Sequence, residues 1–230
     1  MFEDCILFED EHIIVIHKEP YFPVQSGSSV RPDCVTEIKK LLKERDGIRG
    51  EPYTGVIHRL DEPVEGIVVF AKTAKAAAVL SGELAKGGFS KEYTAAVLPV
   101  SDDLQREAVL KDHILTDRRA NRSAIVPEGT KGAKEAKLGY STEGELSDRD
   151  GRKILLLKVL LYTGRHHQIR VQLANAGMPV AGDRKYGEEK LPLPLCLAET
   201  GLSFAHPADG KRMTYSISPG FMEKLKQTGL

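Results

Sequence analysis

The 230-residue sequence has no tryptophan, only three cysteines and no net charge, because 33 basic residues balance 33 acidic ones. Cys5, Cys34 and Cys196 are odd in number and far apart, so they predict neither a disulfide framework nor a zinc site. No apolar run approaches the roughly 20 residues of a membrane span, and the first residues are acidic rather than basic. These absences predict a cytoplasmic protein without a signal peptide or membrane anchor.

The composition still allows a substantial core. Hydrophobic residues make up 41% of the chain and charged residues 29%, which predicts a globular protein built as one large domain or two fused subdomains. The neutral charge limits one class of function, because nucleic-acid-binding domains usually carry a basic excess or at least a basic face. Any surface for nucleic acid must therefore be local.

The best candidate for such a surface is the segment from Arg118 to Lys137. It contains six basic residues, Arg118, Arg119, Arg122, Lys131, Lys134 and Lys137, against only Glu128 and Glu135. Turn-forming residues such as Asn121, Pro127 and Gly129 interrupt it, which predicts a basic loop or arm rather than a helix. A solvated loop without a ligand is the alternative interpretation.

Hydrophobic periodicity and capping residues predict the main elements. The predicted strands are Ile6–Phe8, Ile13–His17, Ile67–Ala71, Lys91–Leu98 and Lys153–Tyr162, and the predicted helices follow Asp33, follow Thr73 and span His166–Ala176. Asp33 and Thr73 are suited to cap the first two helices, and Gly47 and Gly87 to end them. This order is a mixed α+β pattern rather than a regular βαβ alternation.

Asp61 is the first candidate for chemistry. It follows a short apolar run, and Pro63 and Gly66 predict a turn that would hold its carboxylate still. Arg59 is placed to project from the same turn toward a ligand. An Arg-x-Asp sequence in a turn can equally be a surface ion pair of small energetic value.

Arg165 is the second candidate. Thr163 and Gly164 predict a helix start, which would put Arg165 in the first turn, where its planar guanidinium can hold a carboxylate through two hydrogen bonds. If Arg165 meets Asp61, the pair keeps that aspartate ionised. The alternative is a buried ion pair that only fastens the helix to the sheet.

Several segments, in the same order along the chain, resemble the motifs of the RluA-like RNA pseudouridine synthases. They are Ile6–Asp10 with Lys18 and Pro20, His58–Asp61 with Gly66, Ala71-Lys72, Lys91-Glu92-Tyr93, Thr163–Arg170, Gly182-Asp183 with Tyr186-Gly187, and Leu202–Pro207. The resemblance covers nearly the whole chain, whereas one short motif would be weak support. It implies a single catalytic domain over residues 1–230, with a mixed, largely antiparallel central sheet flanked by helices and two fused subdomains around an active-site cleft.

The resemblance also implies the reaction and the roles of residues. A uridine already in RNA would be isomerised to pseudouridine with no cofactor and no metal, after the base is flipped out of its stack. The catalytic residues would be Asp61, Tyr93 and Arg165, with Asp61 attacking the sugar or accepting its proton. The residues expected to contact RNA are Arg59, His58, Lys91, Ile169, Arg118, Arg119 and Arg122. For Ile169, ordinary core packing is the alternative.

The chain departs from the family pattern beside Asp61. Val64 and Glu65 stand where a Thr-Ser pair is common, and Glu65 would raise the pKa of Asp61 if it pointed toward it; we expect it to point away. His166 and Gln172 also differ from the usual residues. The adjacent His166 and His167 do not predict zinc, because neighbouring helical residues face different directions.

Two other functions stay open. An RNA-binding protein that has lost catalysis would bind RNA without forming the isomer, and Val64, Glu65 and the neutral charge favour it. A glycosidase acting through Asp61 and Glu65 would convert free nucleosides, but residues four apart in one turn are poorly placed across a bond. The first strand begins at Ile6, which leaves no room for an N-terminal S4-type RNA-binding domain. We expect a monomer that acts on ribosomal RNA or tRNA.

Overall fold

The protein is described here by a computed structural model that covers residues 2–27, 31–147, 151–187 and 193–227. The chain forms two compact units. Unit 1 comprises Met1–Ser90 and Glu199–Ser218, and unit 2 comprises Lys91–Ala198 and Pro219–Leu230. Unit 1 is therefore built from two stretches of chain that are far apart in sequence.

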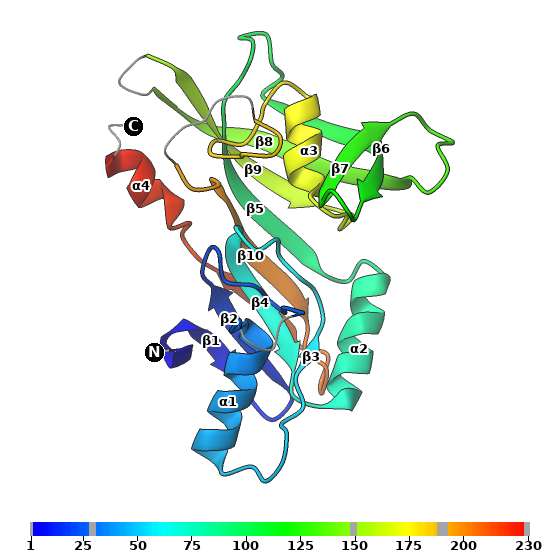
Figure 1. The fold of residues 1–230 in the computed structure, drawn as a ribbon, viewed down its shortest axis with the longest axis vertical. Helices are drawn as coiled ribbons and strands as arrows, with labels where there is room; N and C mark the ends of the chain where they lie inside the picture. Colours follow the sequence, from blue (N-terminus) through cyan, green and yellow to red (C-terminus); the bar gives the residue numbers. More distant parts are fainter. Residues whose placement is uncertain (1, 28–30, 148–150, 188–192, 228–230) are drawn as a thin grey trace. The chain divides into compact units, whose positions relative to one another are not determined.

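Unit 1 is built on a small sheet with helices packed on it, in which the pairs β1–β2, β2–β4, β3–β4 and β10–β11 are antiparallel (Figure 1). Its strands follow the order β1-β2-β4-β10, with β3 paired to β4 and β11 paired to β10. The elements are η1 (Phe2–Cys5), β1 (Ile6–Glu9), β2 (Ile13–Lys18), α1 (Cys34–Asp46), β3 (Gly55–Val56), β4 (Glu65–Ala71), α2 (Ala74–Ala85), β10 (Leu197–Ala205) and β11 (Arg212–Ser216).

The core of unit 1 lies on both faces of β2 and β4. All seven residues of β4 are buried, as expected for a strand covered on both sides. On one face Val15, Val69 and Phe204 pack against Leu80 of α2. Ile14 and Ile16 alternate to the other face of β2 and are also fully buried. The sheet gives the loop between β3 and β4 a rigid base.

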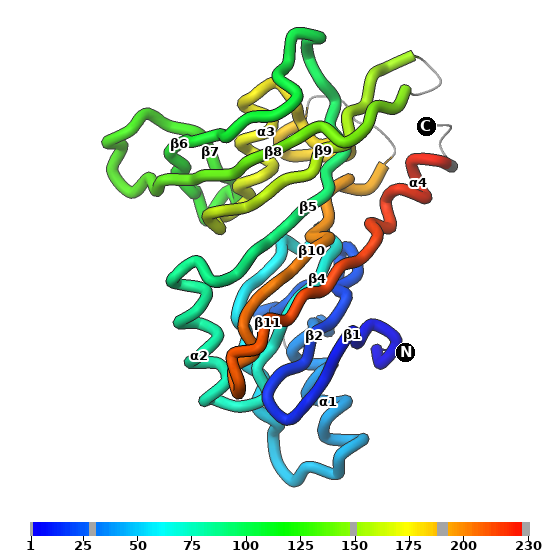
Figure 2. The backbone as a smooth tube through the Cα atoms, turned by 180° about the vertical axis from the view of Figure 1, so that it is seen from behind, coloured from blue at the N-terminus to red at the C-terminus, as the bar shows by residue number. Residues whose placement is uncertain are grey.

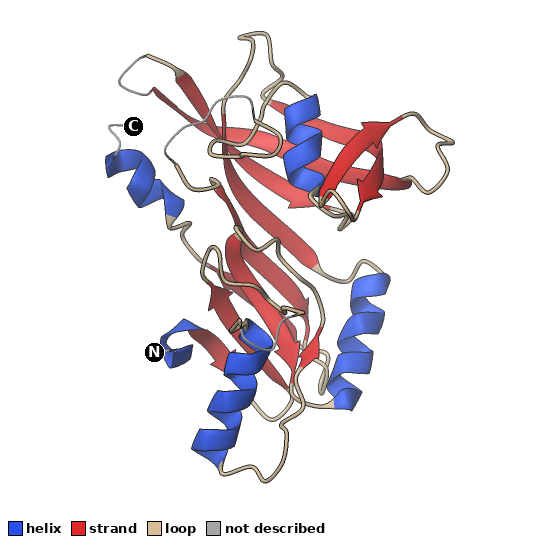
Figure 3. Cartoon of the chain, viewed as in Figure 1, coloured by secondary structure: helices blue, strands red, loops and turns tan. Residues whose placement is uncertain are grey.

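Unit 2 contains antiparallel strands in the order β5-β9-β8-β6-β7, with α3 packed on one face (Figure 3). Its elements are β5 (Ser90–Val97), β6 (Glu107–Asp117), β7 (Arg122–Val126), β8 (Lys134–Ser147), β9 (Lys153–Leu161), α3 (Gln168–Asn175) and α4 (Phe221–Gln227). Beneath α3, Val171 packs on Ile114 and Ala136. Gln172 is buried and donates to Asp112 Oδ2 over 2.6 Å, which fastens α3 to β6.

The predicted helix caps are confirmed. Asp33 Oδ1 accepts a hydrogen bond from the backbone nitrogen of Thr36, and α1 ends at Gly47, whose φ is 62°. Thr73 Oγ1 accepts from the backbone nitrogen of Ala76 at the start of α2. Gly47 adopts the left-handed conformation that glycine favours at a helix end. The mixed α+β class is also confirmed, and no helix among the described residues is long and apolar enough to span a membrane.

Two local predictions are wrong. The third helix begins at Gln168 rather than His166, so Arg165 precedes α3 instead of lying in its first turn. The reason is His167, whose φ of 54° is left-handed and cannot continue a helix. The segment 118–137 is also not one loop, because it contains β7 and the start of β8. Figure 2 traces its two turns, on either side of β7.

Candidate active site

In the loop after β3 of unit 1, burial alternates from Arg59 to Asp61: Arg59 is exposed, Leu60 is buried and Asp61 is partly exposed. Ile57 and Leu60 are each 8% exposed and pack down. The carbonyl of Asp61 accepts from the backbone nitrogen of Val64 over 2.9 Å, which closes the predicted turn. The closed turn therefore fixes the backbone that carries the partly exposed Asp61 side chain, which is how binding loops preorganise a functional group.

His58 anchors the same loop to the sheet. Its Nε2 accepts from the backbone nitrogen of Val69 over 3.3 Å, so the imidazole meets β4 just beyond the point where β3 ends. The ring is 6% exposed and meets the ring of Phe89 edge-on, with 6.1 Å between centroids. These contacts favour a structural role for His58 over the predicted contact with RNA.

Lys18 is a buried cation beneath the Asp61 loop. Only 1% of it is exposed, and its ammonium donates to the carbonyls of Glu19, Phe22 and Glu62 over 2.9, 2.8 and 3.1 Å. Burial lowers the pKa of Lys18 to about 8, against the opposing effect of nearby acidic groups that include Asp61. The lysine thus joins the chain after β2 to the residue next to Asp61 and adds a positive charge near its carboxylate.

Glu65, which replaces a small polar residue of the family pattern, has a partner of its own. Its Oε1 lies 2.8 Å from His17 Nε2 on the neighbouring strand β2. The next residue, Gly66, has a φ of 153°, and a Cβ there would lie 2.6 Å from the Cβ of Glu199. The chain therefore requires glycine at this position.

Tyr93 lies in β5 of unit 2, directly opposite Val159 of β9. It is 6% exposed, and Lys91, two residues earlier on the same strand, is partly exposed. Since residues two apart share a face of a strand, Lys91 and Tyr93 lie on one side of β5. Asp61 belongs to unit 1, so its approach to Tyr93 stays a prediction.

Arg165 lies in the turn that leads into α3. Its Nε donates to the carbonyl of Glu135 over 2.8 Å, and its backbone nitrogen donates to Gln168 Oε1 over 2.9 Å. The same Gln168 oxygen accepts from Thr163 Oγ1 over 2.8 Å. The turn is thus held by side-chain hydrogen bonds before the helix begins. The pairing of Arg165 with Asp61 of unit 1 stays a prediction.

The sequence matches a known protein family over most of its length. A sequence profile described as RNA pseudouridylate synthase matches residues 12–175. The chain belongs to the RNA pseudouridylate synthase family.

Two relatives of this family show how far the similarity reaches. "Ribosomal large subunit pseudouridine synthase D" of Xylella fastidiosa is 35% identical over 81% of this chain and 53% of its own length. "Ribosomal large subunit pseudouridine synthase C" of Salmonella typhimurium is 28% identical over 91% of this chain and 65% of its own. The chain thus spans between half and two thirds of these two proteins.

A solved structure agrees on the fold. "Human RNA Pseudouridylate Synthase Domain Containing 4" superposes with a TM-score of 0.78 over 99% of this chain and 94% of that chain, at 21% sequence identity. At that identity the likeness concerns the fold alone. It confirms the predicted pseudouridine synthase fold.

In this pseudouridylate synthase chain, Tyr186 links the Arg165 turn to β7. Its hydroxyl lies 2.8 Å from His167 Nδ1 and accepts from the backbone nitrogen of Ser123 over 2.7 Å. Burial lowers the pKa of His167 to about 3, with a further contribution from the nearby charge of Arg170. His167 is therefore neutral at physiological pH and serves as a hydrogen-bonding residue of the fold.

His166 and His167 do not face different directions, contrary to the sequence argument. Their rings stack with 3.8 Å between centroids, because neither residue is in the helix. Nδ1 of His166 lies 3.1 Å from Ser123 Oγ and its Nε2 lies 3.0 Å from Asn121 Oδ1. No group of three or more His, Cys, Asp or Glu side chains suited to a metal occurs in the part of the chain that the structure describes.

A buried ion pair between Arg170 and Asp183 packs against Tyr186. Arg170 donates to both carboxylate oxygens of Asp183, over 2.7 and 2.8 Å, and the two side chains are 5% and 0% exposed. Hydrogen bonds and the charge of Arg170 hold the pKa of Asp183 below its usual value although burial opposes them. The guanidinium of Arg170 also lies over the Tyr186 ring, at 5.3 Å from its centroid.

The basic residues of the 118–137 segment lie at the surface around the β6–β7 hairpin. Arg118 and Arg119 are exposed in its turn, and Arg122 opens β7. Arg122 donates to the carbonyl of Lys185, and its guanidinium lies 5.4 Å from the Tyr186 centroid. Ile169, by contrast, is 5% exposed, which favours the alternative of core packing.

The sequence reasoning gave no role to Lys18, Ser123 or Tyr186. Lys18 was part of a motif with Pro20, but its burial and its contact with the carbonyl of Glu62, 44 residues away, leave no local signal. Tyr186 was part of a motif, but its partner Ser123 is 63 residues away along the chain. A contact of that range leaves no local signal in one sequence.

Proposed function

We propose that this protein is an RNA pseudouridine synthase that isomerises one or more uridines in large-subunit ribosomal RNA. The observation that carries the proposal is the Asp61 loop, in which an aspartate of a family motif lies partly exposed in a turn that its own backbone carbonyl closes. Family membership supports it, and the names of both relatives, which specify the large ribosomal subunit, support ribosomal RNA over tRNA.

In the proposed reaction, the bond between C1′ of the ribose and N1 of uracil breaks, the base turns, and C1′ bonds to C5. The proton of C5 leaves and N1 gains a proton, so atoms and electrons balance without a co-reactant. Asp61 attacks C1′ or removes a proton from the sugar. Tyr93 stacks on the base, and Arg165 keeps Asp61 ionised.

The target base has to leave its stack, which costs a few kcal/mol. Arg59 is the proposed residue for the vacated space, because it is exposed beside Asp61 on the same loop. Arg118, Arg119, Arg122 and Lys91 are the proposed contacts to phosphates. We further propose that the protein acts as a cytoplasmic monomer without a cofactor.

The glycosidase alternative is not favoured, because it needs Glu65 as the second carboxylate. Glu65 is 7% exposed and lies 2.8 Å from His17, so its carboxylate is engaged within unit 1. Nothing in the site favours the inactive alternative either.

The test uses total RNA from cells that lack the gene, because this RNA contains the unmodified target whichever molecule it is. Purified protein should add pseudouridine at defined positions, and Asp61→Asn should add none. Glu62→Gln is the matched control, since Glu62 neighbours Asp61 but pairs with Arg31 at the surface. Loss of activity in both variants, or in neither, would contradict a catalytic role for Asp61.

A further inference from the structure

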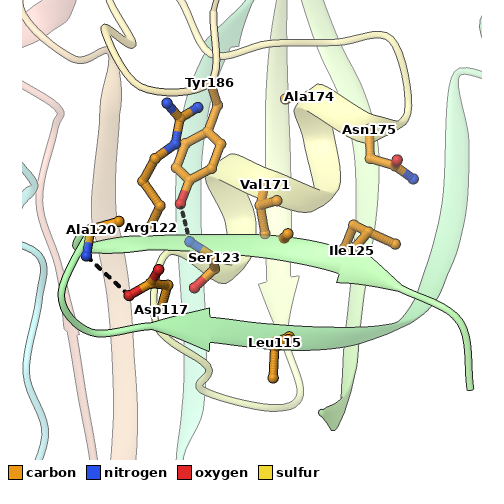
Figure 4. A pocket seen from close by; sticks show the side chains of 11 residues that line it. Leu115, Asp117, Ala120, Arg122, Ser123, Ile125, Val171, Ala174, Asn175 and Tyr186 are labelled. Carbon is orange, nitrogen blue, oxygen red and sulfur yellow. Dashed lines mark hydrogen bonds between the residues drawn. The ribbon is translucent and has the colours of Figure 1, made fainter. Parts of the chain in front are cut away.

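A cavity of about 530 Å³ lies in unit 2 between β7 and α3 (Figure 4). This volume is within the range of about 300 to 1,000 Å³ that small-molecule sites usually have. Apolar side chains from three elements line much of it, namely Leu115, Ala124, Ile125, Val171 and Ala174. Arg122, Asn175 and Tyr186 add polar groups to its wall. None of these residues is among the proposed catalytic residues Asp61, Tyr93 and Arg165, although Arg122 is a proposed contact to phosphates.

The cavity follows the outer edge of β7. This strand is the last in the order of unit 2, and among the described residues it pairs only with β6. The backbone nitrogen of Ser123 points outward, since it donates to Tyr186. In an antiparallel pair, outward backbone groups recur every second residue, so Ile125, which lines the cavity, has its N–H and C=O on the outer edge of β7. A residue of the apolar lining thus carries a backbone donor and acceptor that β6 does not use.

The rim of the cavity is positively charged. Arg122 is exposed, and Arg118 and Arg119 lie in the turn just before it. The one carboxylate of the lining, Asp117, uses Oδ1 to accept from the backbone nitrogens of Arg119 and Ala120, over 2.8 and 3.0 Å. One arginine therefore lines the cavity and two more lie in the adjoining turn, whereas the lining has a single carboxylate, one oxygen of which is already engaged.

From this arrangement we infer that the cavity binds an unstacked nucleobase of the substrate RNA, a neighbour of the reacting uridine rather than that uridine itself. The base lies against Val171, Ile125 and Ala174, and its edge bonds to the backbone of Ile125. The flanking phosphates meet Arg122 and the arginines of the turn. The inference rests on the proposed function, since it names a second contact of the same enzyme with RNA.

An added peptide strand fits this edge less well. β7 has five residues, and the Tyr186 hydroxyl already occupies the outward nitrogen of Ser123. A continuous strand would need that position for its own ladder. A single flat base needs only the backbone groups of Ile125, the next outward-facing residue after Ser123. Guanidinium groups recognise RNA through its phosphates and by stacking on bases.

The test fills the cavity with Ala174→Phe. The control is Ala78→Phe, an exposed alanine of α2 in unit 1. The probe is an octauridylate that carries one 5-iodouridine. Wild-type protein and the control should bind it alike, and Ala174→Phe should bind it at least tenfold more weakly with an unchanged unfolding midpoint. Equal binding by all three, or no binding by the wild type in low salt, would overturn the inference.

Photo-cross-linking tests the same inference with the wild-type protein, so its result does not depend on whether a variant folds. Irradiation should attach 5-iodouridine to the cavity, with Tyr186 or Ile125 as the modified residue in peptide mapping. Cross-links only at other residues, or displacement of the probe by a strand-forming peptide of alternating threonine and valine, would contradict a base site.

Activity on the total RNA described above separates this inference from the proposed function. Ala174→Phe should raise KM and leave kcat unchanged. If the wild type forms no pseudouridine, the proposed function fails while a cross-link at the cavity still supports a base site. If the wild type is active and Ala174→Phe has the same KM, the base site alone fails.

Discussion

The hydroxyl of Tyr186 lies 2.8 Å from Nδ1 of His167. The same oxygen accepts the Ser123 N–H, so the hydroxyl proton is left to donate to a neutral imidazole. This relationship joins three segments, β7, the turn before α3 and the chain that follows α3. Because Arg165 lies in that turn, we expect the contacts of Tyr186 to influence the position of Arg165.

Tyr186→Phe should destabilise the protein by about 1 to 3 kcal/mol, because it leaves the Ser123 N–H without its acceptor. Urea unfolding measures this change. Tyr162→Phe is the control, since Tyr162 is 53% exposed and its ring, which lies 4.9 Å from the Lys137 ammonium, is kept. The control should stay within about 0.5 kcal/mol of the wild type. Similar effects from both variants would argue against the hydroxyl network.

His167→Asn should remove one source of acid sensitivity. The pKa of His167 is about 3 in the folded protein and 6.5 ordinarily, so the unfolded chain binds the extra proton first as the pH falls. Wild-type stability is therefore lost progressively from about pH 6.5 toward pH 3. Asparagine tolerates the left-handed backbone and keeps an acceptor near Nδ1. Urea unfolding at pH 7.5 and 5.0 should show a smaller difference for the variant, and an equal difference would rule out His167 as the cause.

Arg170→Met should cost about 3 to 5 kcal/mol, because it leaves Asp183 charged and buried without its partner. Arg31→Met provides a matched comparison. Arg31 also donates twice to one carboxylate, that of Glu62, but at the surface. Exposed pairs contribute about 0 to 1 kcal/mol. Thermal and urea unfolding should therefore show a much larger loss of unfolding free energy for Arg170→Met than for Arg31→Met, because both pairs have two hydrogen bonds but differ in burial. Equal losses of unfolding free energy would contradict this account.

Gly66→Ala should destabilise unit 1 and lower activity, because the new Cβ would lie within 3 Å of the backbone and side chain of Glu199. Gly82→Ala is the opposite case. Gly82 lies in α2, and a Cβ added there would meet no atom within 4 Å, while alanine favours a helix by up to about 1 kcal/mol. Calorimetry should show a lower midpoint for the first variant and an equal or higher one for the second.

Lys18 should set the alkaline limit of activity. Its pKa is about 8 when folded and 10.5 ordinarily, so loss of its proton above pH 8 weakens the hydrogen bond to the carbonyl of Glu62. In the same window the unfolded chain binds more protons, so this group raises stability as the pH rises. Activity should thus fall while stability does not. In Lys18→Met the alkaline limb should disappear, and in the surface control Lys39→Met it should remain.

Local signals predicted much of unit 1. The buried strand Ile67–Ala71 and the caps Asp33 and Thr73 were found because apolar runs and capping residues act over a few positions. The strands β6, β7 and β8 were missed, because one face of this sheet is largely polar and exposed. Asn121 and Gly129 were predicted as loop residues, and the structure confirms this, because both lie in turns that flank β7 and have a positive φ.

The candidate site also has parts that the sequence predicted from local signals and parts that depend on distant contacts. Asp61 and its turn followed from Pro63, Gly66 and the motif around them, and the carbonyl of Asp61 closes that turn. The start of α3 could not be predicted, because the left-handed His167 depends on Tyr186, 19 residues away. The position of Arg165 before the helix is a consequence of that contact.

The discontinuity of unit 1 has a consequence for its synthesis. Leu202 and Phe204 of β10 complete the core that Val69 of β4 begins, yet about 130 residues separate the two strands. At ribosomal rates of about 5 to 20 residues per second, the apolar surface of β4 waits roughly 7 to 27 s for its neighbour. During that interval the nascent chain exposes an incomplete sheet, which is the point at which a chaperone would bind it.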